Sequence, residues 1–105
     1  MPSLTSIILP NSLKVIGGNF CYQDYALTTV TVGSGVTSVG SGAFQYCNAI
    51  TTYNFYPSTA PTTGTYSFPA RGSSAILHVP ASTSSYTTTP WTNSTYFAQP
   101  ITKDL

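Results

Sequence analysis

The amino-acid sequence predicts a mainly β repeat solenoid, built from 23-residue coils whose short strands stack in parallel, with a β-rich cap at the C-terminal end. The first observation is a repeat, because a shift of 23 residues aligns six positions of residues 4–26 with residues 27–49. The aligned pairs are Leu4/Leu27, Ile7/Val30, Leu9/Val32, Leu13/Val36, Ile16/Val39 and Gly17/Gly40. The second observation is a partial third copy at residues 50–56, which contains Ile50, Tyr53 and Phe55. A fixed period of about 20 to 50 residues is typical of units that bury their apolar side by stacking on one another.

Residues 4–9 predict the first strand of a coil, because inward and outward positions alternate toward its end. We expect Ile7 and Leu9 to face the interior and Ser6 and Ile8 to face outward. Each later copy repeats this pattern, so we expect the strands to pair in parallel with an offset of one period. A slip of one residue would turn the apolar side chains outward, and burial therefore holds the register.

The turns of each coil are predicted at glycines and in a compact arc. A second extended piece, residues 13–16, ends at Gly17-Gly18, where we expect a positive φ that glycine tolerates without steric cost. The arcs, residues 18–26 and 41–49, are expected to be irregular or to form a single helical turn. Phe44 is expected to fill the coil from this side.

Residues 57–105 differ in composition from the coils, and we predict that they form a cap within one domain, residues 1–105. The repeat pattern stops after Phe55, and six of the eight prolines and the only tryptophan follow it. An open coil exposes apolar side chains and strand edges, so a terminal unit of different chemistry is needed to cover them. Within the cap, residues 75–80 predict one more strand, and Tyr86 and Trp91 are expected to pack over the last coil.

Charged residues are scarce, and this scarcity excludes several classes of function. They make up 5% of the chain, and the formal net charge is +1. Nucleic-acid binding is not expected, because affinity for phosphates comes mainly from clustered lysine and arginine. Membrane insertion is not expected either, because no apolar run approaches the roughly 20 residues that span a bilayer. The surface is instead neutral and rich in hydroxyl and amide groups.

Candidate catalytic groups are equally few. His78 is the only histidine, and we interpret it as a surface residue of the strand at residues 75–80. A catalytic triad would need a carboxylate beside it, and the chain has only Asp24, in the first coil, and Asp104, near the end. The same scarcity argues against a glycosidase carboxylate pair and against a metal cage. We therefore expect no enzymatic activity, no catalytic residues, no cofactor and no metal site.

The two cysteines, Cys21 and Cys47, are 26 residues apart and so occupy different positions on neighbouring coils. Buried reduced thiols are the favoured interpretation. A disulfide between adjacent arcs is the alternative, and it requires Cα atoms within about 7 Å in an oxidising compartment.

The two copies resemble the BspA-like class of leucine-rich repeats, whose coil runs roughly L-x-x-I-x-L-P-x-S-(L/V)-x-x-I-G-x-x-A-F-x-x-C. The first coil matches at Leu4, Ile7, Leu9, Pro10, Ser12, Leu13, Ile16 and Gly17. The second matches at Leu27, Val30, Val32, Val36, Val39, Gly40, Ala43, Phe44 and Cys47. The first coil departs from the pattern in its arc, where it has Phe20-Cys21. The tail resembles the C-terminal ending of such proteins at Ala60-Pro61-Thr62, Phe68, Val79-Pro80-Ala81, Tyr86 and Trp91.

The resemblance implies a secreted or surface-anchored array that serves adhesion or partner binding, with an extracellular or cell-surface location and a protein or glycan ligand. The family's motif positions are core positions, so the candidate binding face consists of outward strand positions: Ser6, Ile8, Thr29, Thr31, Thr52 and Asn54. An alternative stays open, namely a structural subunit of an extracellular filament or phage virion that self-associates through the N-terminal coil edge. Further coils and any export signal are expected upstream, in a longer protein.

Overall fold

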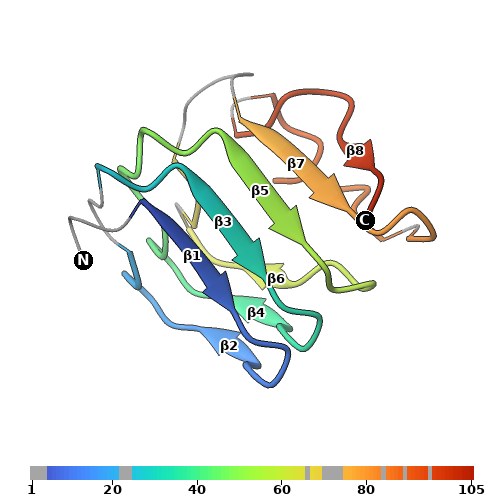
Figure 1. Cartoon of the computed structure of the whole chain (residues 1–105), viewed down its shortest axis with the longest axis horizontal. Coiled ribbons are helices and arrows are strands. Elements are labelled where there is room, and N and C mark those ends of the chain that lie inside the picture. The colour runs from blue at the N-terminus through green and yellow to red at the C-terminus, as the bar shows by residue number, and fades with distance from the viewer. Residues whose placement is uncertain are drawn as a thin grey trace.

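The computed structural model describes residues 5–21, 25–65, 67–69, 75–83, 85–88, 90–94 and 96–105. Two positions discussed above, Leu4 and Asp24, lie outside them. The described residues form eight strands and no helix, in two parallel sheets (Figure 1). The first sheet has the order β1 (Ser6–Leu9), β3 (Thr29–Val32), β5 (Thr52–Phe55), β7 (Ile76–Val79) and β8 (Thr102–Lys103). The second has the order β2 (Val15–Ile16), β4 (Ser38–Val39) and β6 (Thr62–Thr63).

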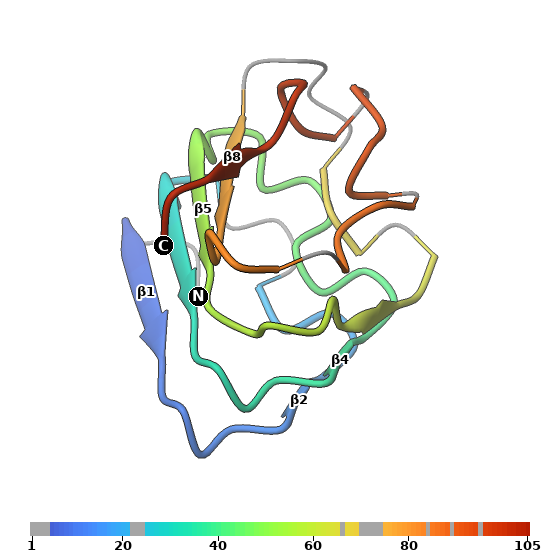
Figure 2. The ribbon, with the colours of Figure 1, turned by 90° about the vertical axis from the view of Figure 1, so that its right-hand side faces the viewer.

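The strand register follows the repeat period and confirms the predicted parallel solenoid. Ser6 pairs with Thr29 and Thr29 with Thr52, so like positions of successive coils lie side by side. The second sheet is stacked in the same way, since Val15 pairs with Ser38. Figure 2 shows the first sheet along one side of the stack and β2 and β4 along another, with the coils enclosing a common interior.

Parallel stacking continues beyond Phe55 into the segment predicted to be a cap. The strand predicted at residues 75–80 is confirmed as β7, which pairs with β5, and β8 extends the sheet by pairing with β7. Thr52 pairs with Ile76, so the coil between them is one residue longer than the repeat. The boundary at residues 56 and 57 stays a prediction, and strand pairing crosses it.

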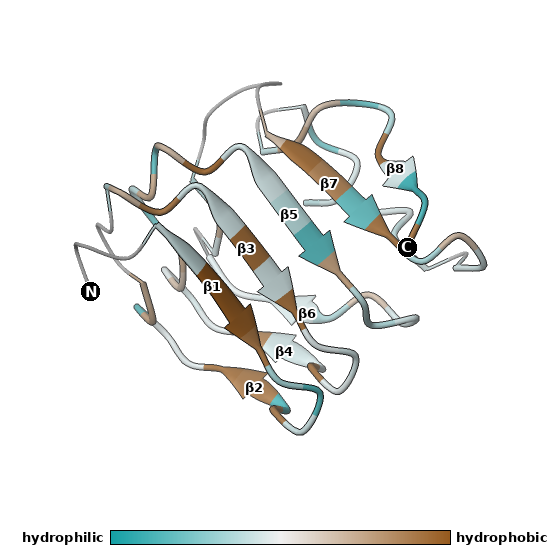
Figure 3. Ribbon diagram, in the orientation of Figure 1, coloured by the Kyte–Doolittle hydropathy of each residue, from teal (hydrophilic) through white to brown (hydrophobic). Residues whose placement is uncertain are grey.

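The core is formed by the inward positions of the strands, as the alternation predicts. Figure 3 shows the alternating hydropathy along β3, where Val30 and Val32 are fully buried and the threonines face outward. The column continues through Tyr53 and Leu77, which have no exposed surface. Burial of each large side chain contributes about 1.5 to 3 kcal/mol, and this holds the strands in register.

Aromatic side chains close the C-terminal end of the core. Trp91 is 2% exposed, and its ring centroid lies 5.3 Å from that of Phe55 and 5.0 Å from that of Tyr86. Phe97 packs edge-on against Tyr53 at 5.1 Å. The predicted packing of Tyr86 and Trp91 over the coils is therefore confirmed, and edge-to-face pairs of this kind are favourable beyond their burial.

The arcs contain turns without a helix among their described residues, and Phe44 is fully buried as expected. The predicted positive φ at Gly17-Gly18 is wrong. Among the described residues, a positive φ is found at Asn19 (56°), Gly42 (70°) and Tyr46 (64°). Asn19 and Gly42 occupy the same position of consecutive coils. Gly40 instead allows the backbones of neighbouring coils to approach each other closely, because a Cβ on Gly40 would lie 2.5 Å from the backbone nitrogen of Gly18.

Candidate functional site

The six residues of the candidate binding face lie on one surface, the outer face of the first sheet. They form two rows across the strands. One row is Ser6, Thr29 and Thr52, and the other is Ile8, Thr31 and Asn54. Their side chains alternate with the inward side chains of the same strands, which are buried on β3 and β5. On β1, Leu9 is buried and Ile7 is half-buried. We call this surface the outer face.

The rows of the outer face continue onto β7. Ile76 lies beside Thr52 and is 44% exposed, and His78 lies beside Asn54. Along the row, the Asn54 side-chain amide donates a hydrogen bond to the Thr31 hydroxyl at 3.4 Å. The face is neutral over β1, β3 and β5, with hydroxyl, amide and methyl groups. An exposed Ile8, with 79% of its surface accessible, ends the row on β1.

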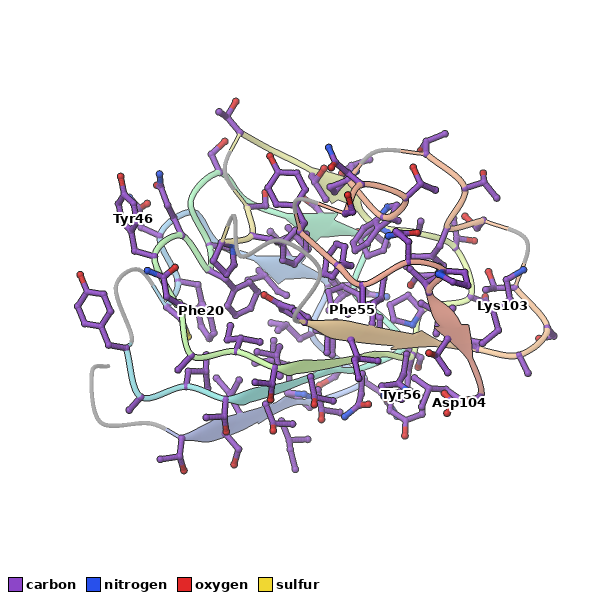
Figure 4. All side chains as sticks on the ribbon, turned by 90° about the horizontal axis from the view of Figure 1, so that it is seen from above. Phe20, Tyr46, Phe55, Tyr56, Lys103 and Asp104 are labelled. Carbon is purple, nitrogen blue, oxygen red and sulfur yellow. The ribbon has the colours of Figure 1, made fainter. Side chains whose placement is uncertain are left out.

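A groove of about 320 Å³ lies at the carboxyl-terminal end of the outer face. It includes Ile8 and Thr31 from the face itself, the Pro10-Asn11 turn, and Tyr56, which follows β5 and is 47% exposed. Figure 4 labels Tyr56, which follows β5, and Asp104, which follows β8. Tyr56 is thus a recognition candidate that continues the outward positions of β5 beyond the end of the strand.

His78 has a carboxylate partner, contrary to the sequence-based expectation. Its Nδ1 lies 2.9 Å from Oδ1 of Asp104, with the two side chains 25% and 53% exposed. Asp104 follows β8, and pairing of β8 with β7 brings the chain end beside His78. The side-chain contact between His78 and Asp104 therefore attaches the segment after β8 to β7.

The two cysteines are buried thiols, which agrees with the favoured interpretation. The Cys47 thiol donates to the backbone carbonyl oxygen of Cys21 at 2.7 Å, between neighbouring arcs. Among the residues that the structure describes, no three His, Cys, Asp or Glu side chains gather where they could hold a metal ion. In the same residues, no helix has the length and apolarity of a membrane span.

Comparison with known proteins places the repeat in a family. A family model described as BspA type leucine-rich repeat region (6 copies) matches residues 1–97. No match was found among curated proteins or among solved structures.

Proposed function

Because the chain belongs to the BspA-type leucine-rich repeat family, we propose that it is a non-enzymatic binding or adhesion module that acts outside the cell or on its surface. Solenoids of this kind present rigid surfaces made by stacked repeats, and the residues of their repeat motif are buried in the core. The partner is a protein or a glycan. The side chains that point outward from the coils therefore bind the partner.

The observation that carries the proposal is the continuous outer face. Strictly parallel register places Thr29, Thr31, Thr52 and Asn54 side by side, on strands that the buried core holds in place. Half-buried threonines lose little rotational freedom on binding, since neighbouring strands already confine them. Such a face offers hydroxyl and amide groups as donors and acceptors without a charge to desolvate.

The shape of the outer face favours a protein partner over a buried small molecule. It is a sheet surface with apolar side chains at both ends, Ile8 on β1 and Ile76 on β7. Tyr56 beside the groove adds an exposed aromatic side chain, a residue type enriched at the centres of interfaces. Because the face is neutral, binding should depend weakly on salt.

The test is binding of the intact chain to immobilised extracellular-matrix glycoproteins and to a glycan array, with matched variants. Thr31→Arg places a bulky cation at the centre of the outer face, and we expect it to weaken binding by about tenfold or more. Ser34→Arg adds the same charge in an exposed turn and should bind as the unchanged chain does. Equal binding by both variants, or no binding to any probe, would contradict the proposal.

A second candidate, a subunit that assembles through its N-terminal edge, is supported by the surface of the first coil. β1 and β2 are the terminal strands of their sheets, and Ile8 and Val15 are 79% and 55% exposed. Such edges are templates for pairing with another chain. Light scattering tests this candidate, because a subunit of this kind should grow in mass with concentration and Val15→Lys should suppress the growth. A chain that stays monomeric at all concentrations would exclude it.

A further inference from the structure

A second recess lies beside β6, away from the outer face. It has a volume of about 280 Å³ and is bordered by Thr63, Thr65, Phe68, Pro90 and Tyr96, among others. We call it the β6 cavity. β6 belongs to the second sheet, so the cavity shares no strand with the binding face described above.

The floor of the β6 cavity carries a polar residue at a position that is apolar in the preceding coils. Ile16 pairs with Val39 and Val39 with Thr63, so the three occupy one inward column. Ile16 and Val39 are each 1% exposed, whereas Thr63 is half-buried. Threonine has nearly the shape of valine but adds a hydroxyl group, which needs a hydrogen-bond partner. In the described part of the chain, no hydrogen bond involves the Thr63 hydroxyl.

Backbone groups of Thr63 also face the cavity side of β6. The N–H groups of Thr62 and Gly64 donate toward β4, to the carbonyl oxygens of Thr37 at 3.0 Å and Val39 at 3.1 Å. Backbone groups of successive strand residues point to opposite edges, so the N–H and C=O of Thr63 point away from β4. No strand among the described residues pairs with this edge.

In the described residues of the next coil, the chain is anchored before β6 begins, and no strand pairs with this edge. The Tyr86 hydroxyl donates to the Pro57 carbonyl oxygen at 2.7 Å, and the Ser85 hydroxyl accepts from the Ala60 N–H at 2.8 Å. These contacts hold the following segment against residues 57–60, before β6 begins. Pro90, farther along, then forms part of the cavity wall.

The walls of the β6 cavity combine apolar surface with hydroxyl groups and carry no charged side chain among the described residues. Phe68, Pro90 and the half-buried Tyr96 provide the apolar part. Thr65, which also borders the cavity, is an exposed residue. The Ser67 hydroxyl is already used within the loop, since it accepts from the Gly64 N–H at 2.9 Å and lies 3.0 Å from the Gly40 carbonyl oxygen.

We propose that the β6 cavity binds one neutral monosaccharide unit, either free or at the end of a glycan. A sugar ring has hydroxyl groups that donate and accept, which suits the Thr63 hydroxyl and backbone groups, and an apolar C–H face, which suits Tyr96 and Pro90. The volume is near the lower end of ligand pockets, about 300 to 1,000 Å³, and fits a single ring better than a larger ligand. The absence of a charged group on the described walls favours a neutral sugar over an acidic one. This site does not depend on the outer face.

The experiment is an NMR titration of the intact chain with galactose, glucose, mannose, fucose and N-acetylglucosamine. We expect at least one sugar to shift the amide resonances of residues 63–68 and Tyr96. Thr63→Val removes only the hydroxyl and restores the residue of the preceding coil, so the fold should keep its stability while affinity falls about three- to tenfold. Tyr96→Leu should weaken binding as well. Thr87→Val, at an exposed position outside both the cavity lining and the outer face, is the matched control and should bind like the unchanged chain.

Several results would overturn the proposal. If none of the five sugars shifts these resonances at millimolar concentration, the cavity is not a sugar site. Shifts confined to the outer face, and reduced by Thr31→Val rather than Thr63→Val, would also refute it. Unaltered affinity in both Thr63→Val and Tyr96→Leu, with their folds intact by thermal unfolding, would do the same. None of these outcomes decides whether the outer face binds a partner, which the Thr31→Arg and Ser34→Arg variants test separately.

Discussion

His78 and Asp104 join the end of the chain to the solenoid, since Nδ1 of the imidazole lies 2.9 Å from a carboxylate oxygen. The two residues are 26 apart in sequence, and the pairing of β7 with β8 brings them together. The backbone N–H of Leu105 adds a hydrogen bond to the Val79 carbonyl oxygen at 3.0 Å. β8 has only two residues, so these contacts matter for its attachment.

Asp104→Ala should loosen β8 with little effect on the rest of the fold. Partly exposed ion pairs contribute about 0.2 to 1 kcal/mol, so the global free energy of unfolding should change by no more than that. The amide proton of Leu105 should exchange faster with solvent, because local opening is governed by local contacts. Asp104→Asn is the control, as its amide oxygen can still accept from the imidazole. Equal exchange in Asp104→Ala and the unchanged chain would show that the pair does not hold β8.

Gly40→Ala should destabilise the stack, whereas Gly17→Ala should not. A Cβ on Gly40 would lie 2.5 Å from the Gly18 nitrogen, and a Cβ on Gly17, at the same position of the preceding coil, meets nothing within 4 Å. Forcing the coils apart should cost about 1 to 3 kcal/mol, and the Gly17 change should stay within about 0.5 kcal/mol. Urea unfolding of both variants measures this. Similar losses would mean that the coils do not approach this closely.

Stability should fall in alkaline solution because of Tyr86. Burial raises the pKa of Tyr86 above its ordinary value of 10.0. In the unfolded chain the phenol loses its proton near pH 10, while in the folded chain the proton is retained to higher pH. The unfolded state therefore binds fewer protons above pH 10, and the free energy of unfolding decreases as the pH rises through this range.

Tyr86→Phe isolates this effect. The variant should lose about 1 kcal/mol at neutral pH, because the Pro57 carbonyl oxygen loses its donor. Its stability should then depend less steeply on pH above 10 than that of the unchanged chain. Thermal unfolding of both chains across pH 7 to 11 measures both quantities. Identical alkaline slopes would show that Tyr86 is not shielded from water.

The cysteines should react with a thiol reagent only after unfolding. Cys21 and Cys47 have no exposed surface in the folded chain. Under non-reducing conditions, Ellman's reagent should therefore label neither residue in native buffer and both in guanidinium chloride. A chain that remains unlabelled in denaturant would instead contain a disulfide bond between Cys21 and Cys47. Cys47→Ala provides the reference for a single thiol.

Much of the fold could be predicted from the repeat. The spacing of Ile7, Val30 and Tyr53 predicts both the parallel register and the inward positions, because a strand has a period of two residues and stacked coils share one interior. The outer face follows from the same alternation. The position of the left-handed turn could not be predicted from the repeat, because Asn19 and Gly42 are different residue types. Gly40 is also misleading, because it is required for close contact between coils and not for a positive φ.

The sequence alone determined the architecture of this protein, its family and its shortage of charge, because these depend on periodic local patterns and on composition. Tertiary structure alone decided which unlike residues meet. It placed Asp104 beside His78, and it placed the half-buried Thr63 in a column that is apolar in the preceding coils. Both outcomes depend on the path of the chain after Phe55, where the exact period of 23 residues is lost, so no repeat pattern predicts them. The physical reason is that contacts outside the repeat are set by the packing of the whole core and not by a periodic spacing.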